Sequence, residues 1–249
     1  EKIAWGITLA YTDVEDIFVE KLDVTNPDKY EYKGKSHDFD IIEETIRVKG
    51  ANDHIEKIKS TVHGPLIGSV TEHTNQIISL CSKSLTPNTI ISGFFDICVA
   101  ENWNDFSQGV EKIKAPQLNI MYGDVEGNIG MYVSGSVPIR NKGAGDVPVP
   151  GWTGEYDWTD EITHAEMPHV LNPDCGYVIS CNHKITDDDY PHYLGNSFMN
   201  GYRAKRIQQR LQETDKLDIE IFKELHKDVV SIPGRRLKEG LIKGFRTAK

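Results

Sequence analysis

One segment, Tyr122–Arg140, constrains the possible fold of this chain more than any other. Its polar run, residues 124–128, ends in Gly127 and Asn128, two residue types that accept the positive φ angles of a tight reversal. Apolar residues spaced two apart flank this run: Ile120, Tyr122, Ile129, Met131 and Val133. Such alternation is typical of strands with one buried face. The segment therefore predicts a β-hairpin.

The runs that precede this hairpin are short, rich in β-branched and aromatic residues, and separated by turn residues. They predict strands over Ile3–Leu9, Ile17–Leu22, Tyr30–Tyr32, Ile41–Val48 and Ile55–His63. A further apolar run follows at Ile90–Val99. A helix is then expected over Glu101–Lys112, because Trp103, Phe106 and Val110 would share one face of it.

The chain changes character after the hairpin. Frequent Gly and Pro residues over 138–176 predict a long ordered loop or a series of turns. A strand is expected over Gly176–Cys181, and helical spacing of apolar residues follows at Ser197 to Gln212 and at Ile219–Val230. Strands that come first and helices that come last favour an α+β fold. We therefore divide the chain into a β-rich part, residues 1–195, and a helical part, residues 196–249.

The charge of the chain limits its partners. A formal net charge of −10 opposes binding to nucleic acid, because such binding needs a basic face that releases counterions. One basic stretch stands near the end of the sequence: Arg235, Arg236, Lys238, Lys243, Arg246 and Lys249. Gly240 and Gly244 interrupt it, so we interpret it as a solvated surface. No apolar run approaches the roughly 20 residues of a membrane span. We expect neither nucleic acid nor a membrane span.

Short motifs run through nearly the whole chain in a set order. The first half contains Ala4-Trp-Gly-Ile-Thr8, Asp13-Val-Glu-Asp16-Ile-Phe18, Thr61-Val-His63-Gly-Pro65, Asn102-Trp103-Asn-Asp-Phe106 and Pro116-Gln-Leu-Asn119. The second half contains Pro138-Ile-Arg140, Pro148-Val-Pro-Gly151, Trp158, Asn172-Pro173, Gly176, Asn182 and Arg203-Ala-Lys-Arg-Ile207. Together they resemble the penicillin acylase (penicillin amidase) family of N-terminal-nucleophile hydrolases. The resemblance implies an antiparallel-sheet core of the αββα type, of which this chain is an internal β-chain portion.

The resemblance also implies a mechanism. Members of this family hydrolyse amides with a serine at the very N-terminus of a processed β chain, and its own α-amine acts through water as the general base. Position 1 here is Glu1, so we expect the nucleophile upstream and little activity from this chain alone. The chain would supply the oxyanion hole from the backbone N–H of Leu9 and the side-chain amide of Asn182. Arg203 would orient that asparagine.

Each assignment has a plainer alternative. An asparagine that follows a strand commonly serves a turn. Arg203 would share a helical face with Arg206 and Arg210, as on a solvated basic surface. His63 is interpreted as structural. For the chain as a whole, the alternatives are a catalytically inactive β-rich interaction module or a calcium-stabilised binding module on the same scaffold.

The pair Asp13 and Asp16 suggests a cofactor. Two carboxylates three residues apart in a turn offer the oxygen ligands that calcium prefers. By resemblance, the backbone carbonyls of Glu15 and Gly145 would join them, while a further family aspartate falls near Leu194 in this sequence. A structural calcium ion is therefore the candidate cofactor.

The expected partners follow from the resemblance. They are a small-molecule amide and the remaining parts of the same precursor, namely the α chain and the N- and C-terminal parts of the β chain. The family resemblance suggests a periplasmic or secreted location. In this interpretation the hairpin Tyr122–Arg140 is scaffold, whose geometry determines where a later segment delivers Asn182.

Overall fold

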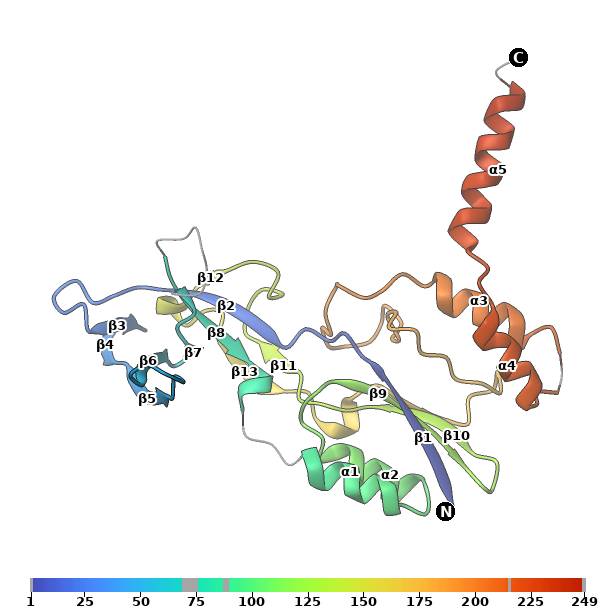
Figure 1. The fold of residues 1–249 in the computed structure, drawn as a ribbon, viewed down its shortest axis with the longest axis horizontal. Helices are drawn as coiled ribbons and strands as arrows, with labels where there is room; N and C mark the ends of the chain where they lie inside the picture. The colour runs from blue at the N-terminus through green and yellow to red at the C-terminus, as the bar shows by residue number, and fades with distance from the viewer. Residues whose placement is uncertain (1, 69–75, 87–89, 215, 248–249) are drawn as a thin grey trace.

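The computed structural model describes residues 2–68, 76–86, 90–214 and 216–247. These residues form an elongated molecule (Figure 1). Small sheets built mainly from the first 82 residues occupy one end, and the sheet that contains the hairpin occupies the other with its covering helices. The last helices lie beyond that sheet, and the final one points away from the body of the molecule.

The largest sheet contains the predicted hairpin. Its four strands are β1 (Ile3–Leu9), β9 (Leu118–Asp124), β10 (Ile129–Val133) and β14 (His169–Leu171), in the order β1-β9-β10-β14. Every neighbouring pair is antiparallel. Strands β9 and β10 reverse through Gly127, whose φ is +93°, so the hairpin prediction is confirmed. Strand β1 begins and ends where the sequence predicted, and it forms one edge of the sheet.

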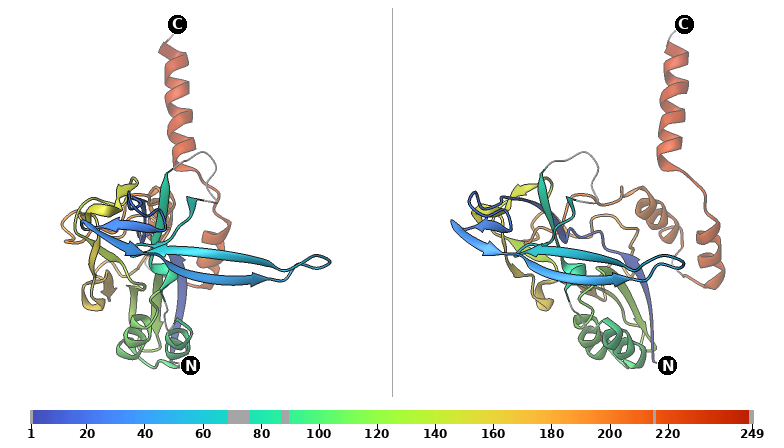
Figure 2. Two further views of the ribbon diagram at one scale, coloured as in Figure 1. Left: turned by 90° about the vertical axis from the view of Figure 1, so that its left-hand side faces the viewer. Right: turned by 60° about the vertical axis from the view of Figure 1, so that its left-hand side comes forward.

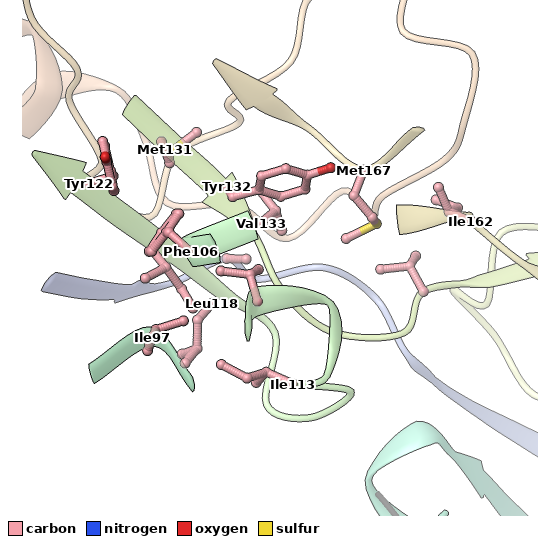
Figure 3. Close-up of a cluster of buried hydrophobic side chains, with 14 of the residues drawn as sticks. Ile97, Phe106, Ile113, Leu118, Tyr122, Met131, Tyr132, Val133, Ile162 and Met167 are labelled. Atoms are coloured by element: carbon pink, nitrogen blue, oxygen red, sulfur yellow. The ribbon is translucent and has the colours of Figure 1, made fainter. Parts of the chain in front are cut away.

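Two helices cover one face of this sheet and enclose the main core. The apolar run 90–99 forms helix α1 (Ile90–Val99), and α2 (Trp103–Glu111) starts at Asn102, whose side chain accepts a hydrogen bond from Asp105 N. A Cβ atom on Gly109 would come within 2.6 Å of the Ile97 side chain, so these helices need glycine at their contact. The core residues drawn in Figure 3 include Ile97, Phe106, Ile113, Leu118, Tyr122, Met131, Tyr132 and Val133.

The other end of the molecule consists of small sheets. Strand β2 (Glu15–Glu20) pairs with β8 (Ile77–Ser82) on one side and with β12 (Val149–Pro150) on the other. Three more small sheets contain β3 (Lys29–Tyr32) with β4 (Lys35–Asp38), β5 (Asp40–Ile46) with β6 (His54–Thr61) and β7 (Gly64–Pro65), and β11 (Pro138–Arg140) with β13 (Trp158–Glu161). The β5–β6 ribbon projects from the body (Figure 2).

The Gly- and Pro-rich segment 138–176 is a series of turns that connects short strands rather than a helix or a central strand. It contains β11, β12, β13 and β14, which all lie at sheet edges or in a two-stranded sheet. Two 3₁₀ helices, η3 (Gly151–Thr153) and η4 (His164–Glu166), connect them, and a third, η2 (Lys83–Leu85), follows β8.

The C-terminal part contains three helices: α3 (Tyr202–Leu211), α4 (Ile219–Lys227) and α5 (Ile232–Thr247). The first begins five residues later than predicted, after Gly201. The basic stretch forms α5 despite Gly240 and Gly244, and its side chains from Pro233 to Phe245 are exposed; Lys249 lies outside the described residues. None of the described helices combines the length and apolar character that crossing a bilayer requires. The division between residues 195 and 196 stays a prediction.

One predicted element is wrong. Residues 176–181 form no strand and pair with none in the described part of the chain. A strand is defined by backbone pairing, whereas this segment reaches β1 through side chains, such as Ser180 against Thr8. The α+β fold class with antiparallel sheets is confirmed, and only β12 pairs in parallel among the described strands.

Candidate active site

Three elements meet at the C-terminal end of β1. Asn182, at the end of the unpaired segment 176–182, donates a hydrogen bond from Nδ2 to the carbonyl oxygen of Leu9, at 2.8 Å. Its backbone has a φ of +62°, a left-handed conformation that asparagine adopts more readily than most residues. Residues 173 positions apart in the sequence are thereby in contact. The structure brings the two predicted oxyanion-hole residues together.

Arg203 joins them from the first turn of α3. Its Nη2 donates to the backbone carbonyl of Cys181 at 2.5 Å and to Oδ1 of Asn182 at 3.0 Å. A guanidinium can only donate, so the amide oxygen of Asn182 must face it. The amide nitrogen is then turned toward Leu9. Arg203 thus holds the Asn182 side chain in this orientation, and its role in catalysis stays a prediction.

The backbone of Leu9 faces the open edge of the sheet. In antiparallel pairing every second residue bonds to a given neighbour, and Ala10 N already donates to Gln117 O at 3.1 Å. The N–H and C=O of Leu9 therefore point away from β9, and its carbonyl accordingly accepts from Asn182. The Leu9 N–H and the Asn182 amide lie on the same side of β1. Two donors aimed at one place are what an oxyanion requires.

The three arginines on α3 have different partners. Arg206 forms hydrogen bonds to both carboxylate oxygens of Asp228, and Arg210 pairs with Glu213. No carboxylate pairs with Arg203 in the described part of the chain. Arg206 and Arg210 are thus ion-paired, whereas the exposed Arg203 binds Cys181 and Asn182, and the alternative of a solvated basic face stays open. Burial and, to a lesser extent, the nearby Arg203 charge lower the pKa of His183.

The sequence did not single out Asn119 as a site residue, although it lies in the same place. It is fully buried in β9, and its Nδ2 donates to Thr8 Oγ1 at 3.2 Å, to Leu9 O at 3.3 Å and to Ser180 Oγ at 2.9 Å. Its signals in the sequence were its place at the end of the motif Pro116-Gln-Leu-Asn119 and an amide between Leu118 and Ile120 in an apolar strand, where asparagine is disfavoured.

The predicted calcium ligands also lie together, around an arginine. Arg140 donates to both carboxylate oxygens of Asp16 and to Oδ1 of Asp13, and Trp158 donates to Asp16 at 2.6 Å. A Cβ atom on Gly145 would lie 2.3 Å from Asp16, so that backbone is in close contact with the carboxylate.

Leu194 stands at the position of the further family aspartate. Its backbone carbonyl accepts a hydrogen bond from Asp13 N at 2.7 Å. Burial raises the pKa of Asp13 despite Arg140, with further contributions from Asp16 and Asp146. Asp16 already has its partners in Arg140 and Trp158. No three His, Cys, Asp or Glu side chains form a metal-holding group within the described ranges. In this structure the carboxylates of Asp13 and Asp16 bind Arg140 and do not form a calcium-binding site, so the calcium ion stays a prediction.

A second polar cluster lies among the small sheets, around His63. Its Nδ1 is 2.9 Å from Oε1 of Glu20 and its Nε2 is 3.2 Å from Oδ1 of Asp157. Thr61 and Ser79 donate to the same Glu20 oxygen, and the ring of Phe18 stacks on the imidazole at 3.9 Å. The side chain of Glu20 is fully buried. We call these residues with Asp157 the His63 cluster.

Comparison with known proteins places the chain in a family. The family model described as penicillin amidase matches residues 1–249. The chain belongs to the penicillin amidase family, and the prediction made from its motifs is confirmed.

Named relatives agree with this assignment. An acyl-homoserine lactone acylase, QuiP, of Pseudomonas aeruginosa is 33% identical over 223 residues, which cover 84% of this chain and 26% of the relative. Penicillin G acylase of Escherichia coli is 34% identical over 192 residues, covering 76% of this chain and 22% of the relative. A solved thermostable penicillin G acylase from Alcaligenes faecalis matches 91% of this chain and 41% of its own, with a TM-score of 0.77 and 25% identity. The chain spans about a quarter of the length of the curated relatives it matches.

Proposed function

We propose that this chain is part of an amidohydrolase of the penicillin acylase type, which cleaves linear, non-peptide amides. One observation carries the proposal: Arg203 holds the Asn182 amide with its nitrogen directed at Leu9, on the open edge of β1. Membership of the penicillin amidase family supports the proposal. The relatives described above, which are named acylases, support it as well.

In this proposal the nucleophile is a serine at the N-terminus of a processed chain and lies outside residues 1–249. The serine oxygen attacks the amide carbonyl carbon, and the α-amine accepts the hydroxyl proton through a water molecule. The carbonyl oxygen becomes an oxyanion, which accepts hydrogen bonds from Leu9 N–H and Asn182 Nδ2. Collapse of this intermediate expels the amine, which takes up a proton, and water then releases the acyl group. The positive charge of Arg203 stabilises the negative charge that develops nearby.

The proposed partners are a small-molecule amide and the remaining parts of the same precursor. One relative, from a Pseudomonas strain, is named a penicillin acylase 2 proenzyme and is about three times as long as the segment that it shares with this chain, which covers 30% of it. Because the open edge of β1 has no strand neighbour in the described ranges, the rest of the precursor has a place to pair there. Because the proposed serine nucleophile belongs to those other parts, this chain purified alone should hydrolyse no amide.

The test uses the full-length protein and a chromogenic phenylacetyl anilide. Asn182→Ala should lower kcat by about 10² to 10³, the usual loss for one oxyanion-hole donor. Asn172→Ala is the matched control, because Asn172 also has a positive φ, of 50°, but bonds to Ile129 N and Asn128 away from the site. It should lower the melting temperature without changing kcat. Full activity in Asn182→Ala would refute the proposal, and a full-length protein without activity on any amide would favour an inactive interaction module.

A further inference from the structure

The polar side chain of Asn119 is fully buried in the middle of the largest sheet. It lies in β9 opposite Thr8 of β1 and Val133 of β10, in the centre of a sheet whose neighbouring residues Leu118 and Ile120 are apolar and buried. Placing an amide there is costly unless its hydrogen bonds are made. Its Oδ1 is buried without a partner among the described residues, whereas its Nδ2 has three acceptors. The Asn119 side chain therefore acts in this structure as a hydrogen-bond donor, through Nδ2.

These three acceptors belong to the two segments that carry the proposed oxyanion donors. Thr8 and Leu9 are in β1, and Ser180 precedes Asn182 by two residues. The segment 176–182 has no backbone pairing with β1 in the described ranges. Its position beside β1 therefore depends on side chains: Asn119 to Ser180, Ser180 to Thr8 at 2.5 Å, and Asn182 to Leu9.

The Leu9 carbonyl sets the orientation of the Asn119 amide. A carbonyl oxygen only accepts, so Nδ2 must face it. Leu9 O thereby accepts from two amides, Asn119 at 3.3 Å and Asn182 at 2.8 Å. Loss of Asn119 would leave Leu9 O with only the hydrogen bond from Asn182, and the Ser180 hydroxyl with only its contact to Thr8, among the described residues. The two oxyanion donors would then lose a common support.

We propose that Asn119 is a positioning residue for the amide hydrolysis inferred above: it ties β1 to the segment 180–182 so that Leu9 N–H and the Asn182 amide converge. This inference rests on the proposed function. Asn119 acts through Leu9 and Asn182 and makes no contact with the reacting atoms.

A double-mutant cycle in the full-length protein tests this role. Asn119→Leu removes the donor at similar size and should lower kcat by roughly tenfold to a hundredfold, because small displacements of catalytic groups have effects of that order. KM should change by less than about twofold. In the Asn182→Ala background the same substitution should lower kcat by a smaller factor, because only Leu9 N–H then remains to be positioned.

Ser134→Ala is the matched control. Ser134 is also buried, and its hydroxyl bonds to Leu118 N and Pro116 O next to Asn119. It should lower the melting temperature while leaving kcat unchanged in both backgrounds. If Asn119→Leu does not fold, Asn119→Asp provides the same test, since a carboxylate accepts from Thr8 and Ser180 but cannot donate to Leu9 O.

The outcomes separate the two proposals. Unchanged kcat in a folded Asn119 variant overturns the positioning role, as does an equal loss of kcat in the presence and absence of Asn182. Full activity in Asn182→Ala overturns the proposed function instead, whatever the Asn119 variants show.

Discussion

The His63 cluster and the site at Leu9, Asn182 and Arg203 are both polar networks that join distant parts of the chain, but they are built in opposite ways. In the His63 cluster the imidazole lies between two carboxylates, and its side chain is 6% exposed. At the site, Asn182 is partly exposed, Arg203 has no carboxylate partner among the described residues, and Leu9 is exposed at a sheet edge.

This difference separates a network that holds a fold from one that is prepared for a ligand. In the His63 cluster the polar side chains bind one another: Glu20 Oε1 accepts from His63, Thr61 and Ser79, and Asp157 contacts His63 and Lys33. The site keeps an unbalanced positive charge and donors that face outward, which cost stability unless something uses them. Substitutions in the first network should therefore change stability, and those in the second should change activity.

The largest effect is expected for His63→Ala. It removes one donor from the fully buried Glu20 and leaves a cavity against Phe18. Breaking a buried pair on one side costs about 3–5 kcal/mol, which a urea titration of the full-length protein would measure. His54→Ala is the control, because exposed His54 pairs only with Glu56 and should cost less than about 1 kcal/mol. A similar small loss for both variants would contradict the structural role of the cluster.

Arg203→Ala should come next and should affect activity. It removes the two hydrogen bonds that hold the Asn182 amide and the Cys181 carbonyl, and because Arg203 is exposed its loss leaves no buried charge unpaired. We expect kcat to fall by roughly tenfold to a hundredfold with a nearly unchanged urea midpoint. Arg210→Ala on the same helix removes an arginine that pairs with Glu213 and should leave kcat unchanged. Equal kcat losses in the two variants would remove the distinction between these arginines.

A smaller effect, on the melting temperature, is expected when the pH is lowered. Burial alone would raise the pKa of Glu20, but hydrogen bonds from His63, Ser79 and Thr61 together outweigh it and lower that pKa below its usual value. A carboxyl with a lowered folded pKa stabilises the protein above its unfolded pKa, and this contribution disappears as the pH falls through the folded value. The melting temperature of Glu20→Gln should thus lie below that of the wild type at pH 6, with a gap that narrows below about pH 4.5. A constant gap would contradict this linkage.

The smallest expected effect concerns calcium. At ten times its dissociation constant, calcium should stabilise the full-length protein by about 1.4 kcal/mol, visible as a rise in melting temperature that a chelator reverses. Asp13→Asn should abolish the rise, because Asp13 is the carboxylate with the fewest competing partners. Magnesium serves as the control ion, since it prefers a tighter octahedral shell. An unchanged melting temperature would eliminate the calcium site.

The hairpin and β1 could be predicted from sequence because their signals are local. Alternation and Gly127 specify β9 and β10 within sixteen positions, residues 118–133. Helix α5 was missed because Gly240 and Gly244 lower helix propensity, and the sequence alone does not show that residues 232–247 continue through them. The strand predicted over 176–181 was wrong because pairing depends on a neighbour, which a local pattern does not reveal.

The candidate site was predictable only in part. Asn182 and Arg203 carried a family motif, and the structure then brought them into contact with Leu9. Asn119 matched the same motif but received no role, because its importance depends on Ser180, 61 residues away. The His63 cluster was hidden for the same reason, since His63 and Asp157 are 94 positions apart. Long-range contacts of single polar side chains leave no periodic trace in a sequence.

The free edge of β1 has a practical consequence for handling this protein. From Ile3 to Ile7 this strand has no strand neighbour on its outer side among the described residues, and the apolar side chains of Trp5 and Ile7 are exposed. Such an edge recruits any extended peptide that can pair with it, including the same strand of another molecule. Residues 1–249 expressed alone should therefore self-associate in a concentration-dependent way. A synthetic peptide that pairs with β1 should suppress this association and keep the chain in solution.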